Sequence, residues 1–125
     1  MKAVIALTIV LLTGGLYAQE WTKVNPEMTS VLSDTNLVLA YVASIEPGQK
    51  SIMHTHSATF IYTITDLKLK VYYADGQVET VEVPAGLGLY ANPEKMHQTE
   101  NIGDKTAKFL LVELKEHPYV SSSSK

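Results

Sequence analysis

Three observations on the sequence predict an all-β fold, either a sandwich or a small barrel. Stretches rich in Val, Ile, Thr, Leu and Tyr recur at short spacing, and such branched and aromatic side chains suit the pleated surface of a strand. Gly, Pro, Asn and Asp residues separate these stretches, as turns between short strands require. No stretch carries a 3.6-residue apolar period of helical length. The 125 residues, 46% of them hydrophobic, are enough for one domain with a real core.

The expected strands follow one another from residue 37 onward. Segment 37–45 is continuously apolar, whereas segment 67–73 alternates in the manner of a half-buried strand. Asp75-Gly76 gives the clearest hairpin signal, because this pair accepts the positive φ angles of tight β-turns. Residues 21–33 have a mixed, turn-rich composition and are expected to contain no strand. The full set of expected strand segments is 37–45, 51–56, 59–65, 67–73, 77–83, 89–91, 96–101 and 106–115.

The first eighteen residues have the pattern of a secretory signal peptide. Lys2 precedes a short apolar run, which is followed by a glycine pair and then by the small residue Ala18. The run is shorter than the roughly 20 residues of a membrane-spanning helix. We therefore expect residues 1–18 to be removed, residues 19–125 to form a single exported domain, periplasmic or secreted, and its serine-rich end, 118–125, to be disordered.

Composition excludes several classes of function. The net charge is −3, with ten Lys and no Arg, so no basic surface for nucleic acid is expected. No membrane association is expected for the mature chain. The sequence contains no Cys, which excludes disulfides, thiolate metal sites and cysteine nucleophiles. Any bound metal must therefore be held by nitrogen and oxygen atoms.

Three of the four histidines are candidate metal ligands. His54 and His56 lie two apart in a strand segment, so their side chains leave the same face. His97 opens a later strand that a barrel can bring opposite, and neutral imidazoles are good ligands for transition metals. His117 follows the last strand and is expected to be exposed, while Trp21 could close one end of the barrel or contact a ligand. Residues expected to line the pocket are Phe60, Tyr62, Tyr90 and Gln98.

The spacing around these histidines resembles that of the cupin family. Gly48 is followed after five residues by His54 and His56, and His97 is followed by Asn101 at the family's spacing. The family's two motifs read G-x5-H-x-H-x(3,4)-E-x6-G and G-x5-P-x-G-x2-H-x3-N, and the resemblance covers residues 36–115. It implies a cupin-type double-stranded β-helix, or jelly-roll, barrel.

The sequence departs from these motifs at several points, among them the first-motif Gly, where Asp66 or Leu67 stands, and the second-motif Gly, near which Lys95 lies. The first-motif Glu would fall at Phe60 or Ile61, neither of which can bind a metal, and Pro93 lies one residue closer to His97 than the pattern asks. The resemblance therefore implies a site of three histidines, without the motif carboxylate. It implies a divalent transition metal, whether Zn, Fe, Cu, Ni or Mn.

Two classes of function remain open at this stage. The first is a metal-dependent enzyme, an oxygenase or isomerase that acts on a small organic molecule. The alternative is a non-catalytic barrel that binds a small ligand or a metal, because one fold hosts many functions. The apolar segment 37–45 could form a sheet edge, through which we expect a homodimer to assemble.

Overall fold

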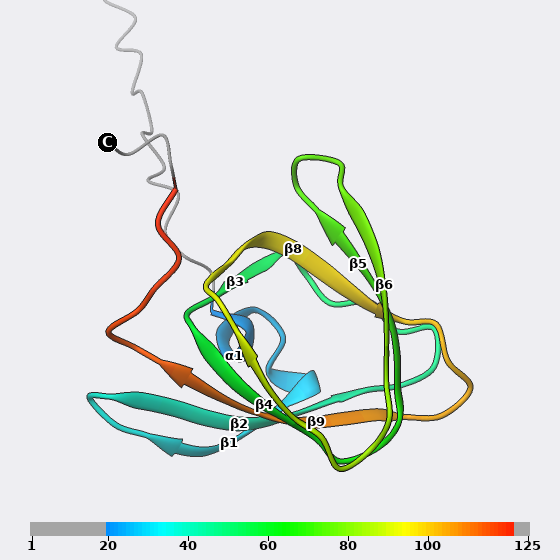
Figure 1. Ribbon diagram of the computed structural model, residues 1–125, viewed down its shortest axis with the longest axis horizontal. Helices are drawn as coiled ribbons and strands as arrows, with labels where there is room; N and C mark the ends of the chain where they lie inside the picture. The colour runs from blue at the N-terminus through cyan, green and yellow to red at the C-terminus, as the bar shows by residue number, and fades with distance from the viewer. Residues whose placement is uncertain (1–19, 122–125) are drawn as a thin grey trace, which may run out of the picture.

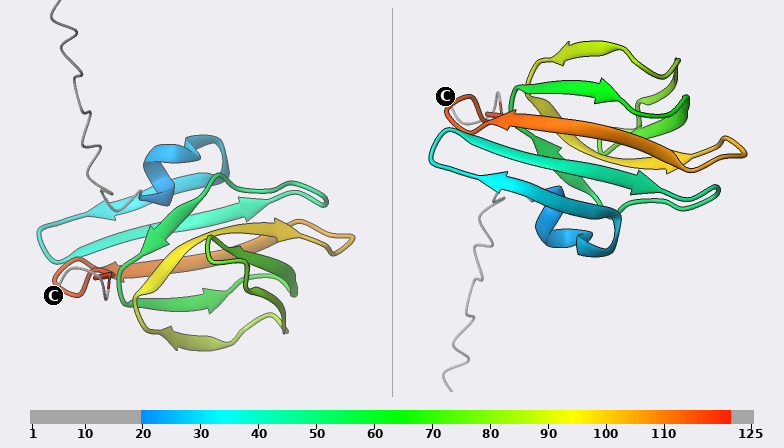
Figure 2. Two further views of the ribbon diagram at one scale, coloured as in Figure 1. Left: turned by 90° about the horizontal axis from the view of Figure 1, so that it is seen from above. Right: turned by 90° about the horizontal axis from the view of Figure 1, so that it is seen from below.

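The computed structural model describes residues 20–121, which form two antiparallel sheets that face each other across an apolar interior (Figures 1 and 2). One sheet has five strands in the order β1-β2-β9-β4-β7, and the other has four in the order β3-β8-β5-β6. The strands are β1 (Thr29–Asp34), β2 (Val38–Ile45), β3 (His54–His56), β4 (Thr59–Thr63), β5 (Leu67–Tyr73), β6 (Val78–Val83), β7 (Gly88–Ala91), β8 (Glu94–Asn101) and β9 (Ala107–Leu114).

Alternation of side chains between the two faces of each strand builds the core. Strands β2 and β9 bury every second residue, and β5 does so from Leu67 to Val71, as the period of a half-buried strand requires. β2 and β9 pair along their whole length and contribute to one cluster. That cluster contains Trp21, Leu39, Tyr41, Ala43, Ile45, Leu67, Leu69, Ala107, Phe109 and Leu111.

The N-terminal segment differs from the sequence-based expectation. Residues expected to contain no strand form the short helix α1 (Trp21–Val24), the 3-10 turn η1 (Pro26–Met28) and most of strand β1. Five of the six residues of β1 are exposed, so this strand has no apolar alternation to detect and forms by pairing with β2. Figure 2 shows α1 on the side of the molecule where β1 and β2 lie.

The predicted hairpin and strand positions are otherwise close to those observed. Gly76 has a φ of 93° in the turn between β5 and β6, as expected. Segment 37–45, however, does not form a sheet edge, because β2 lies between β1 and β9. The proposed dimer contact through that edge is therefore wrong. The expected signal peptide, 1–18, and residues 122–125 of the expected disordered tail lie outside the described residues.

Among residues 20–121, no helix has the length and apolar character needed to cross a membrane.

Candidate metal centre

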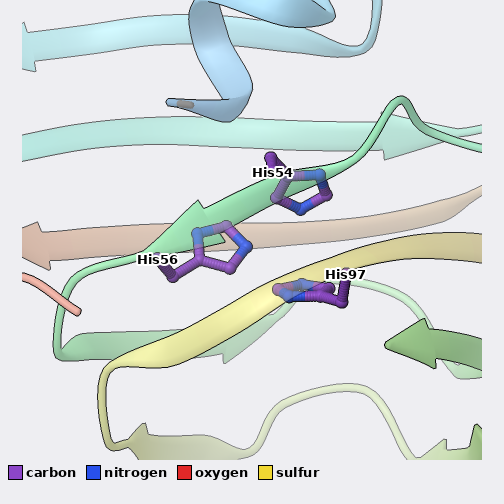
Figure 3. A group of neighbouring side chains, drawn as sticks. All are labelled: His54, His56 and His97. Atoms are coloured by element: carbon purple, nitrogen blue, oxygen red, sulfur yellow. The ribbon is translucent and has the colours of Figure 1, made fainter. Parts of the chain in front are cut away.

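Pairing of the short strand β3 with β8 brings the three candidate histidines together (Figure 3). His54 and His97 are direct cross-strand partners, and His56 follows on the same face of β3. Ring centroids lie 4.5 Å apart for His54 and His97, 4.8 Å for His54 and His56, and 5.3 Å for His56 and His97. All three side chains are buried, and we call this group the histidine cluster.

Backbone carbonyls determine which ring nitrogen carries the proton in two of the three imidazoles. His54 Nδ1 lies 2.7 Å from the carbonyl oxygen of Ile52, and His97 Nδ1 lies 2.7 Å from that of Lys95. A carbonyl oxygen can only accept a hydrogen bond, so each Nδ1 must be the donor. In the neutral rings Nε2 is then left with a free lone pair, which is the form that binds a metal.

His56 is held by a buried carboxylate instead of a carbonyl. Its Nδ1 lies 3.3 Å from Glu113 Oε1, which also accepts a hydrogen bond of 3.0 Å from the backbone N–H of Ser57. The hydroxyl of Tyr41 donates to Glu113 Oε2 at 2.8 Å. Burial raises the pKa of the Glu113 carboxyl, but the hydrogen bond and the electrostatic attraction of His56, with hydrogen bonds from Tyr41 and Ser57, outweigh it, so the pKa lies below its usual value. Glu113 is therefore an ionised acceptor for His56 Nδ1.

Burial favours the uncharged form of two of the three imidazoles, those of His54 and His97. Burial, with smaller contributions from His56 and His97, lowers the pKa of His54 to about 2. Burial also lowers the pKa of His97, more than the charge of Glu94 raises it. His54 Nε2 is one of two buried side-chain polar atoms in the described chain that lack a hydrogen-bond partner. Such an atom is destabilising unless something binds it, and three imidazoles that converge in this way could hold a metal ion.

An apolar cavity of about 130 Å³ adjoins the histidine cluster. His56, His97 and Glu94 supply its main polar groups, and aliphatic side chains from both sheets supply most of the remaining wall. Trp21 closes one side: it is 1% exposed and stacks on His54 with 4.7 Å between ring centroids. Of the two roles suggested for Trp21, the structure supports closure of one end of the barrel. The indole ring also packs directly on His54, a candidate metal ligand.

The residues expected to line the pocket lie elsewhere. Phe60, Tyr62 and Tyr90 are each more than 40% exposed, and the cavity is lined instead by their neighbours along β4 and β7. The alternation of His54 and His56 does not continue to Phe60 and Tyr62, because the chain crosses between β3 and β4 from one sheet to the other. Gln98 alternates with the buried residues of β8 and bonds through its amide to the carbonyl of Ser51 at 3.2 Å.

Two groups near the cluster escaped the sequence analysis. Glu113 shares the buried face of β9 with Phe109 and Leu111. A single acidic residue at an inward-facing position of an apolar strand could therefore have indicated a functional group. Glu94 lies on β8 opposite His56, a relation that no local pattern contains. His117 is exposed, as expected.

Comparison with known proteins supports the fold. No protein-family model matches the sequence, and no curated protein matches it. A cupin domain from Bordetella pertussis Tohama I is similar in structure, with a TM-score of 0.62 and 21% identity over 69% of this chain and 90% of that chain. A protein with a double-stranded beta-helix domain from Klebsiella pneumoniae has a TM-score of 0.56 and 25% identity, covering 69% and 74% of the two chains.

An enzyme is also among the similar structures. Oxalate decarboxylase of Bacillus subtilis, a protein with Mn(II) centres, has a TM-score of 0.54 and 26% identity over 75% of this chain. This chain spans only 27% of the length of that enzyme. The described residues therefore have the cupin-type double-stranded β-helix fold predicted from the sequence.

Proposed function

We propose that this protein binds a divalent transition metal through Nε2 of His54, His56 and His97, and acts with it on a small organic molecule. The observation that carries the proposal is the donor arrangement of the histidine cluster. Each Nδ1 faces an acceptor, so each Nε2 keeps its lone pair, and that of His54 is buried without a partner. A divalent cation would satisfy all three nitrogens at once.

The remaining residues of the site support a reaction on a small, largely apolar compound. A cavity of about 130 Å³ is close in size to engineered cavities of about 150 Å³ that hold benzene. Its aliphatic wall limits the access of water to His56 and His97, which strengthens electrostatic interactions there. A metal bound here would supply a Lewis acid, or a centre at which dioxygen is activated. An oxygenase or isomerase reaction fits this combination best.

A non-catalytic binding barrel remains the alternative, and the apolar cavity lining favours it. Apart from Glu94 and the histidines, no titratable side chain among residues 20–121 lines the cavity, so these residues offer little acid–base catalysis. Oxygen uptake and product formation by the metal-loaded protein, screened over catechols, flavonols, thiols and sugars, distinguish the two. Binding of such a compound without turnover would favour the binder.

Metal binding is tested by substituting each histidine separately. His54→Ala, His56→Ala and His97→Ala should each remove stoichiometric binding in isothermal titration calorimetry, whereas His117→Ala should not. A metal that binds the folded chain raises Tm by linkage, so this rise should disappear in the three variants and persist in the control. A metal-free parent that binds none of Zn, Cu, Ni, Fe or Mn would exclude the proposed site.

We also propose that the protein is exported, on the basis of the Lys2, apolar-run and Ala18 pattern in residues 1–18. N-terminal sequencing of the native protein should then begin at or near Gln19. An intact Met1 on abundant cytoplasmic protein would contradict this.

A further inference from the structure

Glu94 reaches the face of β8 that carries His97 because the pairing of β3 with β8 is irregular. His54 is opposite His97, and His56 is opposite Glu94. Two residues of β3 therefore span the same distance as three residues of β8, so β8 contains one extra residue, as in a β-bulge. In a regular strand, positions 94 and 97 would point to opposite faces. The extra residue brings the Glu94 carboxylate to the same side as the histidine cluster.

The carboxylate of Glu94 lies at the rim of the cavity, partly exposed to solvent. Its Oε1 accepts a hydrogen bond of 3.2 Å from the hydroxyl of Tyr73, and its Oε2 lies 3.5 Å from His97 Nε2. Glu94 lines the apolar cavity together with His56 and His97. Its side chain is 37% exposed, whereas that of His97 is 3% exposed. Glu94 can therefore reach the cluster from the rim of the site without full burial of its charge.

No hydrogen bond joins Glu94 Oε2 to Nε2 of a neutral His97, because neither atom carries a proton. His97 Nδ1 donates to the carbonyl of Lys95, so Nε2 of the neutral ring presents a lone pair to the carboxylate. Two acceptors at 3.5 Å repel each other, and a cation bound by both atoms removes the repulsion.

We propose that Glu94 is the fourth protein ligand of the metal centre and supplies, from β8, the carboxylate that positions 60 and 61 of this chain lack. This inference rests on the proposed metal site of the histidine cluster. The carboxylate neutralises one of the two charges of a divalent ion. As an oxygen donor it also favours Mn and Fe more than imidazoles alone would.

The test compares two glutamates of the same strand. Glu100 also lies on β8 and accepts a hydrogen bond from a tyrosine, Tyr72, at 2.8 Å, but it pairs with Lys70 away from the cluster. In titrations of metal-free protein with Mn(II), Glu94→Gln should weaken binding at least about tenfold, since even residues that only contact a ligand contribute 10–100-fold. Glu100→Gln should bind like the parent. Glu94→Asp, which keeps the carboxylate, should retain more affinity than Glu94→Gln.

The low-temperature electron paramagnetic resonance spectrum of bound Mn(II) gives a second measurement. Its fine structure should change in Glu94→Gln and remain unchanged in Glu100→Gln. If Glu94→Gln keeps the parent affinity and spectrum while His97→Ala loses the metal, Glu94 is not a ligand and the three-histidine site stands. If neither the parent nor any variant binds Mn(II), Zn(II) or Fe(II), both the proposed site and the role of Glu94 are overturned.

Discussion

The carboxylate of Glu113 offers a sharp test of how the histidine cluster is organised, because three donors converge on its two oxygens. They are the imidazole of His56 at 3.3 Å, the N–H of Ser57 at 3.0 Å and the hydroxyl of Tyr41 at 2.8 Å. Glu113→Gln preserves the shape of the side chain, but its amide offers one oxygen instead of two and carries no charge. We expect His56 to lose the charged acceptor that fixes Nδ1 as donor and Nε2 as the free nitrogen, because the amide oxygen accepts more weakly.

The magnitudes follow from these contacts. Loss of a group that orients a metal-bound imidazole lowers metal affinity by 10–100-fold, or about 1.4–2.7 kcal/mol. A neutral amide also makes weaker hydrogen bonds than a carboxylate, so the free energy of unfolding of the metal-free protein should fall by about 1–2 kcal/mol. Tyr41→Phe, which removes one donor but leaves the carboxylate on His56, should reduce metal affinity less than Glu113→Gln does.

Calorimetric titration with Zn(II) and urea denaturation without metal measure the two effects separately. Glu100→Gln serves as the control, because its carboxylate accepts from Tyr72 and contacts none of the three histidines. If Glu113→Gln were less stable but kept the parent's dissociation constant, Glu113 would be only a structural residue of β9. The reasoning about the tautomer of His56 would then be refuted.

Three further results are expected. The folded chain holds His54 neutral, with its pKa lowered from 6.5 to about 2 by burial, whereas the unfolded chain binds this proton near pH 6.5. The metal-free protein should therefore lose up to about 1.4 kcal/mol of stability per pH unit below pH 6.5, and His54→Gln should reduce this slope in urea denaturation. Trp21→Ala should lower the free energy of unfolding by about 3–5 kcal/mol, and a loss below about 1 kcal/mol would contradict its place in the core. Light scattering at micromolar concentration should give a dimer, for which the exposed Phe60, Tyr62 and Tyr90 offer an apolar surface, and a clean monomer would exclude it.

Local pattern was sufficient to predict most strands and the three histidines. The alternation in segment 67–73 and the turn at Asp75-Gly76 depend only on neighbouring residues, and the observed β5 and the following turn agree with them. The spacing of His54 and His56 likewise places both side chains on one face through the period of a strand. Such features need no knowledge of the partner strand.

The tertiary structure alone decided which groups surround the histidines. Glu113 meets His56 across 57 positions of sequence, and Trp21 packs on His54 from a segment in which no strand was expected. The same applies to Glu94, which the extra residue in β8 places opposite His56. Sheet order, strand register and bulges arise from contacts between distant segments, and a shift of one residue reverses the face on which a side chain lies. For this reason the sequence could predict that the three histidines come together, but not which carboxylates lie beside them.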